Sequence, residues 1–164
     1  MGGGTWRLRL AKEDFKFSVA HFTLFSAERA EPLHGHNYRM SVEVEGDSLG
    51  ESGLVADTDA LKAAIRAVCA GLDDRVLLPE RSPWLRIEPS AGGLECRFAE
   101  RRYLFPEGEV RLLPLINVSM ELLARWVWDE LARDLEGRGL ARLAVEVEET
   151  SGQSCRYGAD LSGI

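Results

Sequence analysis

The fold is decided by the stretch from His34 to Glu45, which reads H-G-H-N-Y-R-M-S-V-E-V-E. Apolar and polar side chains alternate along it from Tyr38 onward, and this period of two predicts a β-strand with one buried face. The buried face would carry Tyr38, Met40, Val42 and Val44. Because His36 has the same parity, the apolar face of this strand ends in an imidazole.

A second strand is predicted just before this one, and it also ends in a histidine. Residues 15–21 alternate, and the parity of His21 is shared by Phe15, Phe17 and Val19. Residues 5–10 alternate as well, but residues 11–14 interrupt the pattern. Two interpretations fit this interruption: one strand with a bulge or turn, or a hairpin.

The three histidines of the chain follow the pattern H-x12-H-x-H. Residues i and i+2 of a strand face the same side, so His34 and His36 can converge on one ion. Neutral imidazole is a preferred ligand of zinc, and three protein ligands leave one position open, as in catalytic zinc sites. The histidines could instead be ordinary polar residues at strand ends. Their shared parity and neighbourhood favour zinc held by His21, His34 and His36.

Two helices are predicted further along the chain. The first is capped by Asp57 or Thr58 and has Leu61, Ile65 and Leu72 at helical spacing. The second covers about residues 119–136 and is capped by Asn117 or Ser119. Its buried stripe would consist of Met120, Leu123, Val127, Leu131 and Leu135.

Residues 79–116, between the helices, are predicted to form an elaborated excursion from this domain and not a second domain. They contain prolines and short strand-like pieces around 84–88, 94–98 and 101–105. A last strand is predicted over 142–150, where Glu149 continues the apolar parity of Leu143, Val145 and Val147. Glu149 either anchors a ligand that carries N–H donors or simply reaches water. The element order predicts one α+β domain over residues 1–164, with two helices on an antiparallel sheet.

Composition excludes several classes of function. The formal net charge is −7 and no basic stripe is present, so a nucleic-acid partner is not expected. No apolar run has the roughly 20 residues of a membrane span, and no signal peptide is visible. Three cysteines without close pairs indicate a reduced, cytoplasmic protein. Residues 1–4 predict a flexible lead-in.

Several segments resemble the 6-pyruvoyltetrahydropterin synthase and 6-carboxytetrahydropterin synthase family, the latter a queuosine-pathway enzyme. The matching segments are 17–21 (F-S-V-A-H), 33–38 (L-H-G-H-N-Y), 54–57 (L-V-A-D) with 61–62 (L-K), 72–73 (L-D), 119–128 and 148–150 (E-E-T). The resemblance covers most of the chain except the excursion. Its specific part is the histidine triad with H-G-H-N-Y.

The resemblance implies a tunnelling fold in which the barrel is completed by homo-oligomerisation, as trimers that stack into hexamers. It implies Zn²⁺ on His21, His34 and His36. It also implies a small-molecule, pterin-like substrate whose ring is bound by Glu149, with assistance from Thr150 and Ser119. A carboxylate suits the N–H groups of a pterin ring.

The chain departs from the family at two catalytic positions. The familiar enzymes carry a cysteine shortly before H-G-H, whereas residues 27–33 read A-E-R-A-E-P-L. The family has Asp-His where this chain has Asp73-Asp74. Some members resemble this chain in carrying a glutamate before L-H-G-H, and these resemble enzymes that cleave dihydroneopterin to 6-hydroxymethyldihydropterin. Glu31 is therefore either a catalytic base or an ordinary loop glutamate.

The main hypothesis is a zinc-dependent lyase for a pterin or pterin-like heterocycle. Glu31 would carry protons, and Asp73 and Asp74 would form a second acid/base pair. Arg101, Arg102 or Arg156 could receive phosphates or could lie at a solvated surface. The alternatives are a non-catalytic protein that binds zinc and a heterocycle, a lyase for a different heterocycle, and a structural zinc domain.

Overall fold

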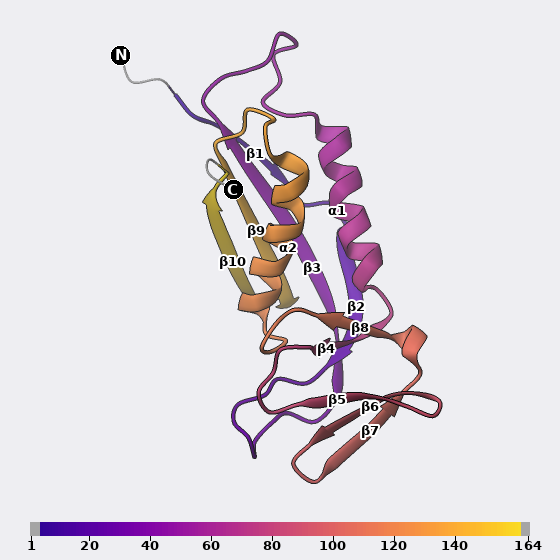
Figure 1. Cartoon of the computed structure of the whole chain (residues 1–164). Helices are drawn as coiled ribbons and strands as arrows, with labels where there is room; N and C mark the ends of the chain where they lie inside the picture. The colour runs from indigo at the N-terminus through magenta and orange to yellow at the C-terminus, as the bar shows by residue number, and fades with distance from the viewer. Residues whose placement is uncertain (1–3, 162–164) are drawn as a thin grey trace.

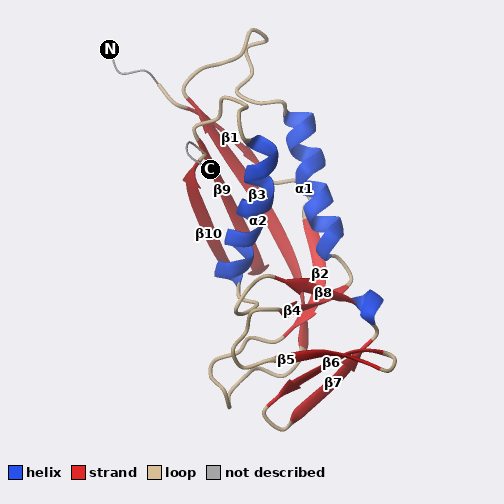
Figure 2. Ribbon diagram, viewed as in Figure 1, coloured by secondary structure: helices blue, strands red, loops and turns tan. Residues whose placement is uncertain are grey.

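The computed structural model describes residues 4–161, so the lead-in expected over residues 1–4 lies outside it except for Gly4. Figure 2 shows the strands of a main sheet and of a small sheet in red and the helices in blue. The main sheet contains β1 (Trp6–Leu10), β2 (Lys16–His21), β3 (His34–Gly46), β4 (Arg75–Pro79), β8 (Val110–Leu113), β9 (Arg142–Thr150) and β10 (Gln153–Asp160). The small sheet contains β5 (Arg86–Ser90), β6 (Gly93–Phe98) and β7 (Arg101–Phe105). The helices are α1 (Thr58–Leu72), α2 (Met120–Leu135) and the short 3-10 helix η1 (Glu107–Glu109).

The main sheet confirms the α+β prediction but is mixed. Its order is β10-β9-β3-β2-β4-β8, with β1 paired to β3 as the seventh strand. The pairs that involve β3 are antiparallel as expected. The strand β10, which lies beyond the predicted last strand, pairs antiparallel with β9. The pairs β2–β4 and β4–β8 are parallel, which corrects the expectation of a wholly antiparallel sheet. β4 ends where the excursion over residues 79–116 begins and β8 lies near the end of the excursion, so the long crossover between them permits parallel pairing.

The central strand β3 resolves the interruption over residues 11–14. β2 pairs with its first part, from His21↔His34 to Lys16↔Arg39. β1 pairs with its second part along the same edge, with Leu10 opposite Val42. β1 and β2 are therefore one interrupted strand, and the hairpin alternative is wrong.

Both helices lie on one face of the main sheet, as predicted, and run side by side (Figure 1). Asp57 caps α1 by accepting from the N–H groups of Asp59 and Ala60. Ser119 caps α2 by accepting from the N–H of Leu122. The helices and the apolar face of the sheet share one core, to which β3 contributes Tyr38, Met40, Val42 and Val44.

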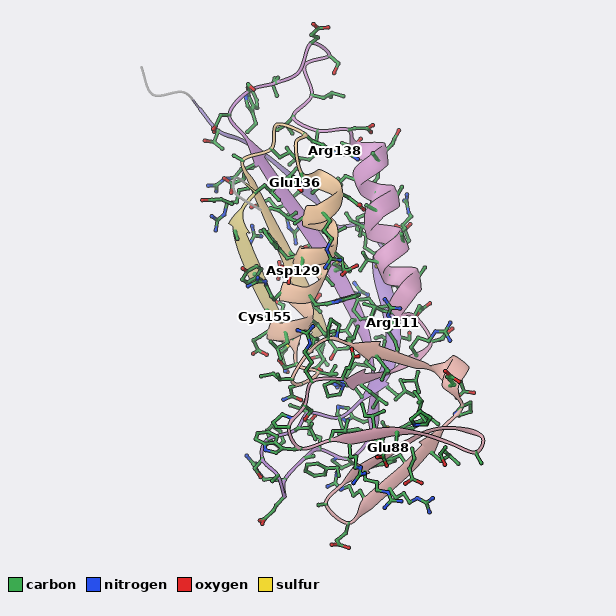
Figure 3. The ribbon with its side chains drawn as sticks, in the orientation of Figure 1. Glu88, Arg111, Asp129, Glu136, Arg138 and Cys155 are labelled. Atoms are coloured by element: carbon green, nitrogen blue, oxygen red, sulfur yellow. The ribbon has the colours of Figure 1, made fainter. Side chains whose placement is uncertain are left out.

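The excursion forms the small antiparallel sheet, whose strands lie close to the predicted pieces. This sheet covers one end of the molecule: Figure 3 shows Glu88, on β5, far from Arg138, which follows α2. It has a separate core that it shares with the loop over residues 22–33. The buried members of this core are Phe22, Leu24, Ala30, Leu78, Leu85, Cys96 and Phe98.

Two further expectations concern helices and cysteines. Across residues 4–161, neither helix combines the length and apolarity that a membrane crossing requires. The three cysteines form no disulfide: Cys69 and Cys96 are buried, and Cys155 is partly exposed.

Candidate metal centre and its neighbours

Strand register brings the three histidines together. His21 and His34 are directly opposite each other in the β2–β3 ladder, and His36 lies two residues further along β3. One ring nitrogen from each of the three histidines lies within 4.8 Å of the others. The predicted triad therefore exists as a cluster at the end of the apolar sheet face.

The outer nitrogens of two rings are held by backbone carbonyls. His21 Nδ1 lies 3.3 Å from the carbonyl oxygen of Val118, and His34 Nδ1 lies 2.8 Å from that of Pro32. A carbonyl can only accept, so Nδ1 of each ring carries the proton and Nε2 presents a lone pair. Burial lowers the pKa of His21, and neighbouring His34 lowers it further. Neutral imidazoles fixed in this way fit a zinc ion.

Glu149 reaches the histidine cluster and not bulk water. Its Oε1 lies 3.3 Å from Nε2 of His36 and 3.6 Å from Nε2 of His21. The hydroxyl of Tyr38 donates to the same oxygen at 2.7 Å, and Gln153 Nε2 donates to Oε2 at 3.2 Å. This carboxylate can accept N–H groups of a ligand bound beside the three histidines.

Tyr38 belongs to the site but was not predicted to, because its place in the alternating pattern of the strand indicates a core residue. The side chain is fully buried, yet its hydroxyl lies between Glu149 and Nε2 of His21, 3.2 Å from the latter. Burial raises the pKa of Tyr38, and the hydrogen bond to Glu149 raises it further, so the phenol stays protonated. A signal was available, since a buried tyrosine needs a partner for its O–H.

Glu31 lies on the other side of the cluster. Its Oε2 is 3.9 Å from Nε2 of His34 and accepts the backbone N–H of Thr23 at 3.0 Å. Partial burial raises the pKa of Glu31, but the hydrogen bonds from Thr23 help to leave the pKa below its ordinary value. The carboxylate is therefore ionised at neutral pH and available as a base.

The structure places Asp73 and Asp74 beside Ser18, at the end of α1. Asp73 Oδ1 accepts the N–H of Ser18 at 2.7 Å, and the N–H of Asp74 donates to the carbonyl of Ser18 at 2.8 Å. Asp74 and His36 line the same open depression of about 370 Å³. No direct contact joins either aspartate to a histidine within residues 4–161.

Ser119 and Thr150 have different surroundings. The hydroxyl of Ser119 serves as the α2 cap. Thr150 is exposed and lines a depression of about 190 Å³ together with Glu149. The same depression is also lined by Asn37, Arg39, Glu148 and Ser151. Of the two, Thr150 is the one that adjoins Glu149.

The three arginines considered for phosphates are engaged within the protein. Arg101 donates to the carbonyls of Glu31 and Ala30 at 2.6 and 3.1 Å. Arg102 donates to Glu95 at 2.6 Å, and Arg156 pairs with Glu43. Each of the three thus has a partner within the protein, and none of these contacts places an arginine at the histidine cluster.

The sequence profile of the 6-pyruvoyl tetrahydropterin synthase family matches residues 9–160. The chain belongs to this family. A Methanocaldococcus jannaschii relative, provisionally named 6-carboxy-5,6,7,8-tetrahydropterin synthase, is 28% identical over 87% of this chain and 88% of its own length. The 6-carboxy-5,6,7,8-tetrahydropterin synthase of Haemophilus influenzae is 23% identical over 91% of this chain and 97% of its own. This pterin synthase family member thus has relatives named as tetrahydropterin synthases, which implies an enzyme of the lyase type.

Solved structures agree with the family assignment. The 6-pyruvoyl tetrahydropterin synthase of Plasmodium vivax is 26% identical, with a TM-score of 0.90 over 96% of this chain and 99% of its own. The Plasmodium falciparum enzyme is 26% identical, with a TM-score of 0.89 over 95% and 98%. For the P. vivax protein, solved variants have a catalytic glutamate replaced by alanine or by cysteine. This family member therefore has the tunnelling fold of the pterin synthases.

Proposed function

We propose that the protein is a zinc-dependent lyase that cleaves the side chain of dihydroneopterin, with Glu31 as general base. The observation that carries the proposal is the position of the Glu31 carboxylate, 3.9 Å from Nε2 of His34 at the edge of the histidine cluster. A base at this place can reach a hydroxyl of a substrate bound beside the metal ligands. The catalytic glutamate of the P. vivax relative supports the same role for Glu31.

The thiols of the chain are poor candidates for the acid/base group. Burial raises the pKa of Cys69 to about 11 and that of Cys96 to about 11. Burial also raises the pKa of Cys155. A thiol with a raised pKa stays protonated at neutral pH and neither accepts a proton nor attacks as a nucleophile. Side-chain cleavage by a carboxylate is therefore favoured over cysteine-dependent chemistry.

The proposed reaction is a reverse aldol cleavage. Glu31 takes the proton of the 2′-hydroxyl, the C1′–C2′ bond breaks, and C2′ leaves as the aldehyde carbon of glycolaldehyde. The electron pair of the broken bond passes to C1′ and is delocalised into the neighbouring C6=N5 imine of the ring. Glu31 then returns the proton to C1′, which gives 6-hydroxymethyldihydropterin. Atoms and electrons balance without an oxidant or reductant.

His21, His34 and His36 would hold the zinc ion through their Nε2 lone pairs. When bound, zinc polarises the side-chain hydroxyls of the substrate and lowers their pKa. The carbonyls of Val118 and Pro32 keep two of the imidazoles in the tautomer that this requires.

Glu149 would bind the pyrimidine edge of the pterin. Tyr38 and Gln153 donate to its two oxygens and so orient the carboxylate toward the cluster. Thr150 lines the adjoining depression and is the better second ring contact, because the Ser119 hydroxyl is held in the helix cap. Asp73 and Asp74 stay predicted proton carriers, and the proposed reaction gives them no step within one chain.

We infer that the protein works in the cytoplasm as a homo-oligomer, a trimer or hexamer, as in its family. In the described chain, β10 and β8 end the main sheet, and each leaves one edge without a partner strand. An open edge exposes N–H and C=O groups that a neighbouring subunit can pair. Light scattering on the zinc-loaded protein tests this, and a monomer at micromolar concentration would contradict it.

Product analysis by mass spectrometry tests the reaction. The zinc-loaded protein is incubated separately with dihydroneopterin and with its triphosphate. We expect 6-hydroxymethyldihydropterin and glycolaldehyde from the first, and a loss of turnover of about 10²- to 10⁴-fold in Glu31→Gln. Glu28→Gln, which changes an exposed glutamate of the same loop, is the matched control.

The other outcomes are equally informative. A pyruvoyl or carboxy product would mean that groups other than a cysteine perform the familiar family reactions. Tight binding of dihydroneopterin without turnover, with zinc content confirmed, would replace the lyase by a pterin-binding protein. No binding and no turnover would point to a different heterocycle.

A further inference from the structure

The loop over residues 22–33 carries the candidate base but has little pairing of its own. Its one β-bridge in the described chain joins Leu24 and Ala30. The N–H of Glu31 donates to the carbonyl of Thr23 at 3.0 Å, and the N–H of Thr23 donates to the Glu31 carboxylate. These contacts tie Glu31 to the start of the loop but not to the rest of the molecule.

The loop is also joined to the segment before α2, through hydrogen bonds of Thr23 and Leu24 with Val118 and Asn117. Arg101, at the start of β7, supplies the polar connection at the other end of the loop, next to Glu31. Its Nη1 donates to the carbonyl oxygen of Glu31 at 2.6 Å, and its Nη2 donates to that of Ala30 at 3.1 Å. The other two nearby arginines of the small sheet, Arg97 and Arg102, both pair with the buried carboxylate of Glu95. Arg101 has no ion-pair partner among residues 4–161, so these two carbonyls are its polar partners.

The two carbonyls belong to the two peptide groups on either side of the Glu31 Cα. A peptide group is planar, so the only soft rotations between these two planes are φ and ψ of Glu31. One rigid guanidinium that binds both oxygens fixes the two planes relative to each other. It thereby fixes the direction in which the Glu31 side chain leaves the backbone.

We propose that Arg101 is a positioning residue for the base, and that the small sheet exists in this protein to support Glu31. This inference rests on the proposed function, because it gives Arg101 a role in the same reaction. It also accounts for the excursion, which brings Arg101 to a loop 70 residues away in sequence. Arg101 touches no substrate in this scheme and acts through the backbone of Glu31.

The test compares Arg101→Ala with Arg86→Ala. Arg86 lies in the same small sheet, pairs with exposed Glu88 and does not contact the loop, so the change in charge is matched. We expect kcat of Arg101→Ala to fall about 10- to 100-fold, because misplacement of a reacting group by about 1 Å costs on the order of 10²-fold. KM and zinc content should stay at their wild-type values, and Arg86→Ala should match the wild type throughout.

Hydrogen exchange supplies a readout that needs no substrate. In Arg101→Ala the amides of Glu31 and Thr23 should exchange faster than in Arg86→Ala, because the loop loses its connection to β7. Arg101→Lys, which keeps a cationic donor but loses the planar fork, should be intermediate in both kcat and exchange. It also keeps the proposal testable if Arg101→Ala does not fold.

The outcomes separate this inference from the function on which it rests. If the wild type turns over neither pterin, the proposed function fails, and the exchange rates alone decide whether Arg101 holds the loop. If the wild type is active but kcat or loop exchange of Arg101→Ala equals that of Arg86→Ala, the positioning role is overturned. A fall in zinc content in Arg101→Ala would also overturn it, because the role would then belong to the metal ligands.

Discussion

The two sheets of this protein place functional groups in different ways. The main sheet positions the three histidines proposed to hold zinc by backbone pairing, because His21 and His34 are register partners in the β2–β3 ladder. The small sheet positions Glu31 through one side chain, Arg101, which holds backbone carbonyls of a loop. Many backbone hydrogen bonds fix the positions of residues in the β2–β3 ladder, whereas few hydrogen bonds fix the position of the loop over residues 22–33. The metal centre should therefore tolerate distant substitutions that the base does not.

The largest effect is expected from the metal centre itself. His36→Ala removes a partly exposed ligand from β3 without changing the ladder, so the fold should be retained. Loss of an outer-shell partner costs about 10- to 100-fold in metal affinity, and loss of a ligand should exceed that. Zinc content by mass spectrometry should fall, and turnover should be lost. Full zinc content in this variant would mean that the register does not define the metal site.

Removal of zinc sharpens the same comparison. Because backbone register and not the metal brings the histidines together, the chelated protein should keep its far-ultraviolet circular dichroism. Its melting temperature should nevertheless fall, since a ligand at about 100 times its dissociation constant stabilises the folded state by about 2.7 kcal/mol. Unfolding on chelation would instead identify a structural zinc domain.

Asn117→Ala tests the loop over residues 22–33 at the contact it makes with the segment before α2. The Asn117 amide accepts from the N–H of Leu24 and donates to its carbonyl, at 3.0 and 2.8 Å. Its loss leaves both groups unpaired, at about 1–3 kcal/mol each before the loop relaxes. We expect a lower free energy of unfolding in urea, a lower kcat and unchanged zinc content. An unchanged kcat would show that the loop is held by contacts other than these.

The smallest effect is expected from a comparable contact in the main sheet. Trp128 Nε1 donates to the carbonyl of Leu143 at 2.8 Å, which joins α2 to β9. Trp128→Phe should cost about 1 kcal/mol of unfolding free energy in urea, with kcat and zinc content unchanged. A drop in kcat as large as that of Asn117→Ala would remove the proposed distinction between the two regions.

The difference between local strand pairing and contacts between distant segments also decides which features could be predicted from the sequence. Alternation in β3 and the parity of His36 predicted the strand and the clustering of the histidines, because both depend on local periodicity. The caps at Asp57 and Ser119 were predictable for the same reason. The strand β10 was missed, since its side chains are largely exposed or only partly buried and carry no clear alternation.

Contacts between distant segments could not be read in this way. The parallel pairing of β4 with β8 depends on where the chain returns after the excursion. The partners of Arg101 lie 70 and 71 residues away, and nothing in its own neighbourhood distinguishes it from Arg102. Glu31 and His34 are only three residues apart in the chain, but the direction of the Glu31 side chain toward His34 needed the structure.

The parallel pair β4–β8 has a consequence for how such a protein can diversify. The excursion leaves the main sheet after Pro79 and returns at Val110, which pairs with Val76, so both junctions lie on adjacent strands. Doubling the length of a connection costs only about 0.6 kcal/mol in closure entropy. Insertions and deletions between these junctions can therefore change the small sheet that contacts Glu31, while the β2–β3 pair that carries the histidines keeps its register. The segment that supports Glu31 and the strands that carry the histidines can therefore change independently in length.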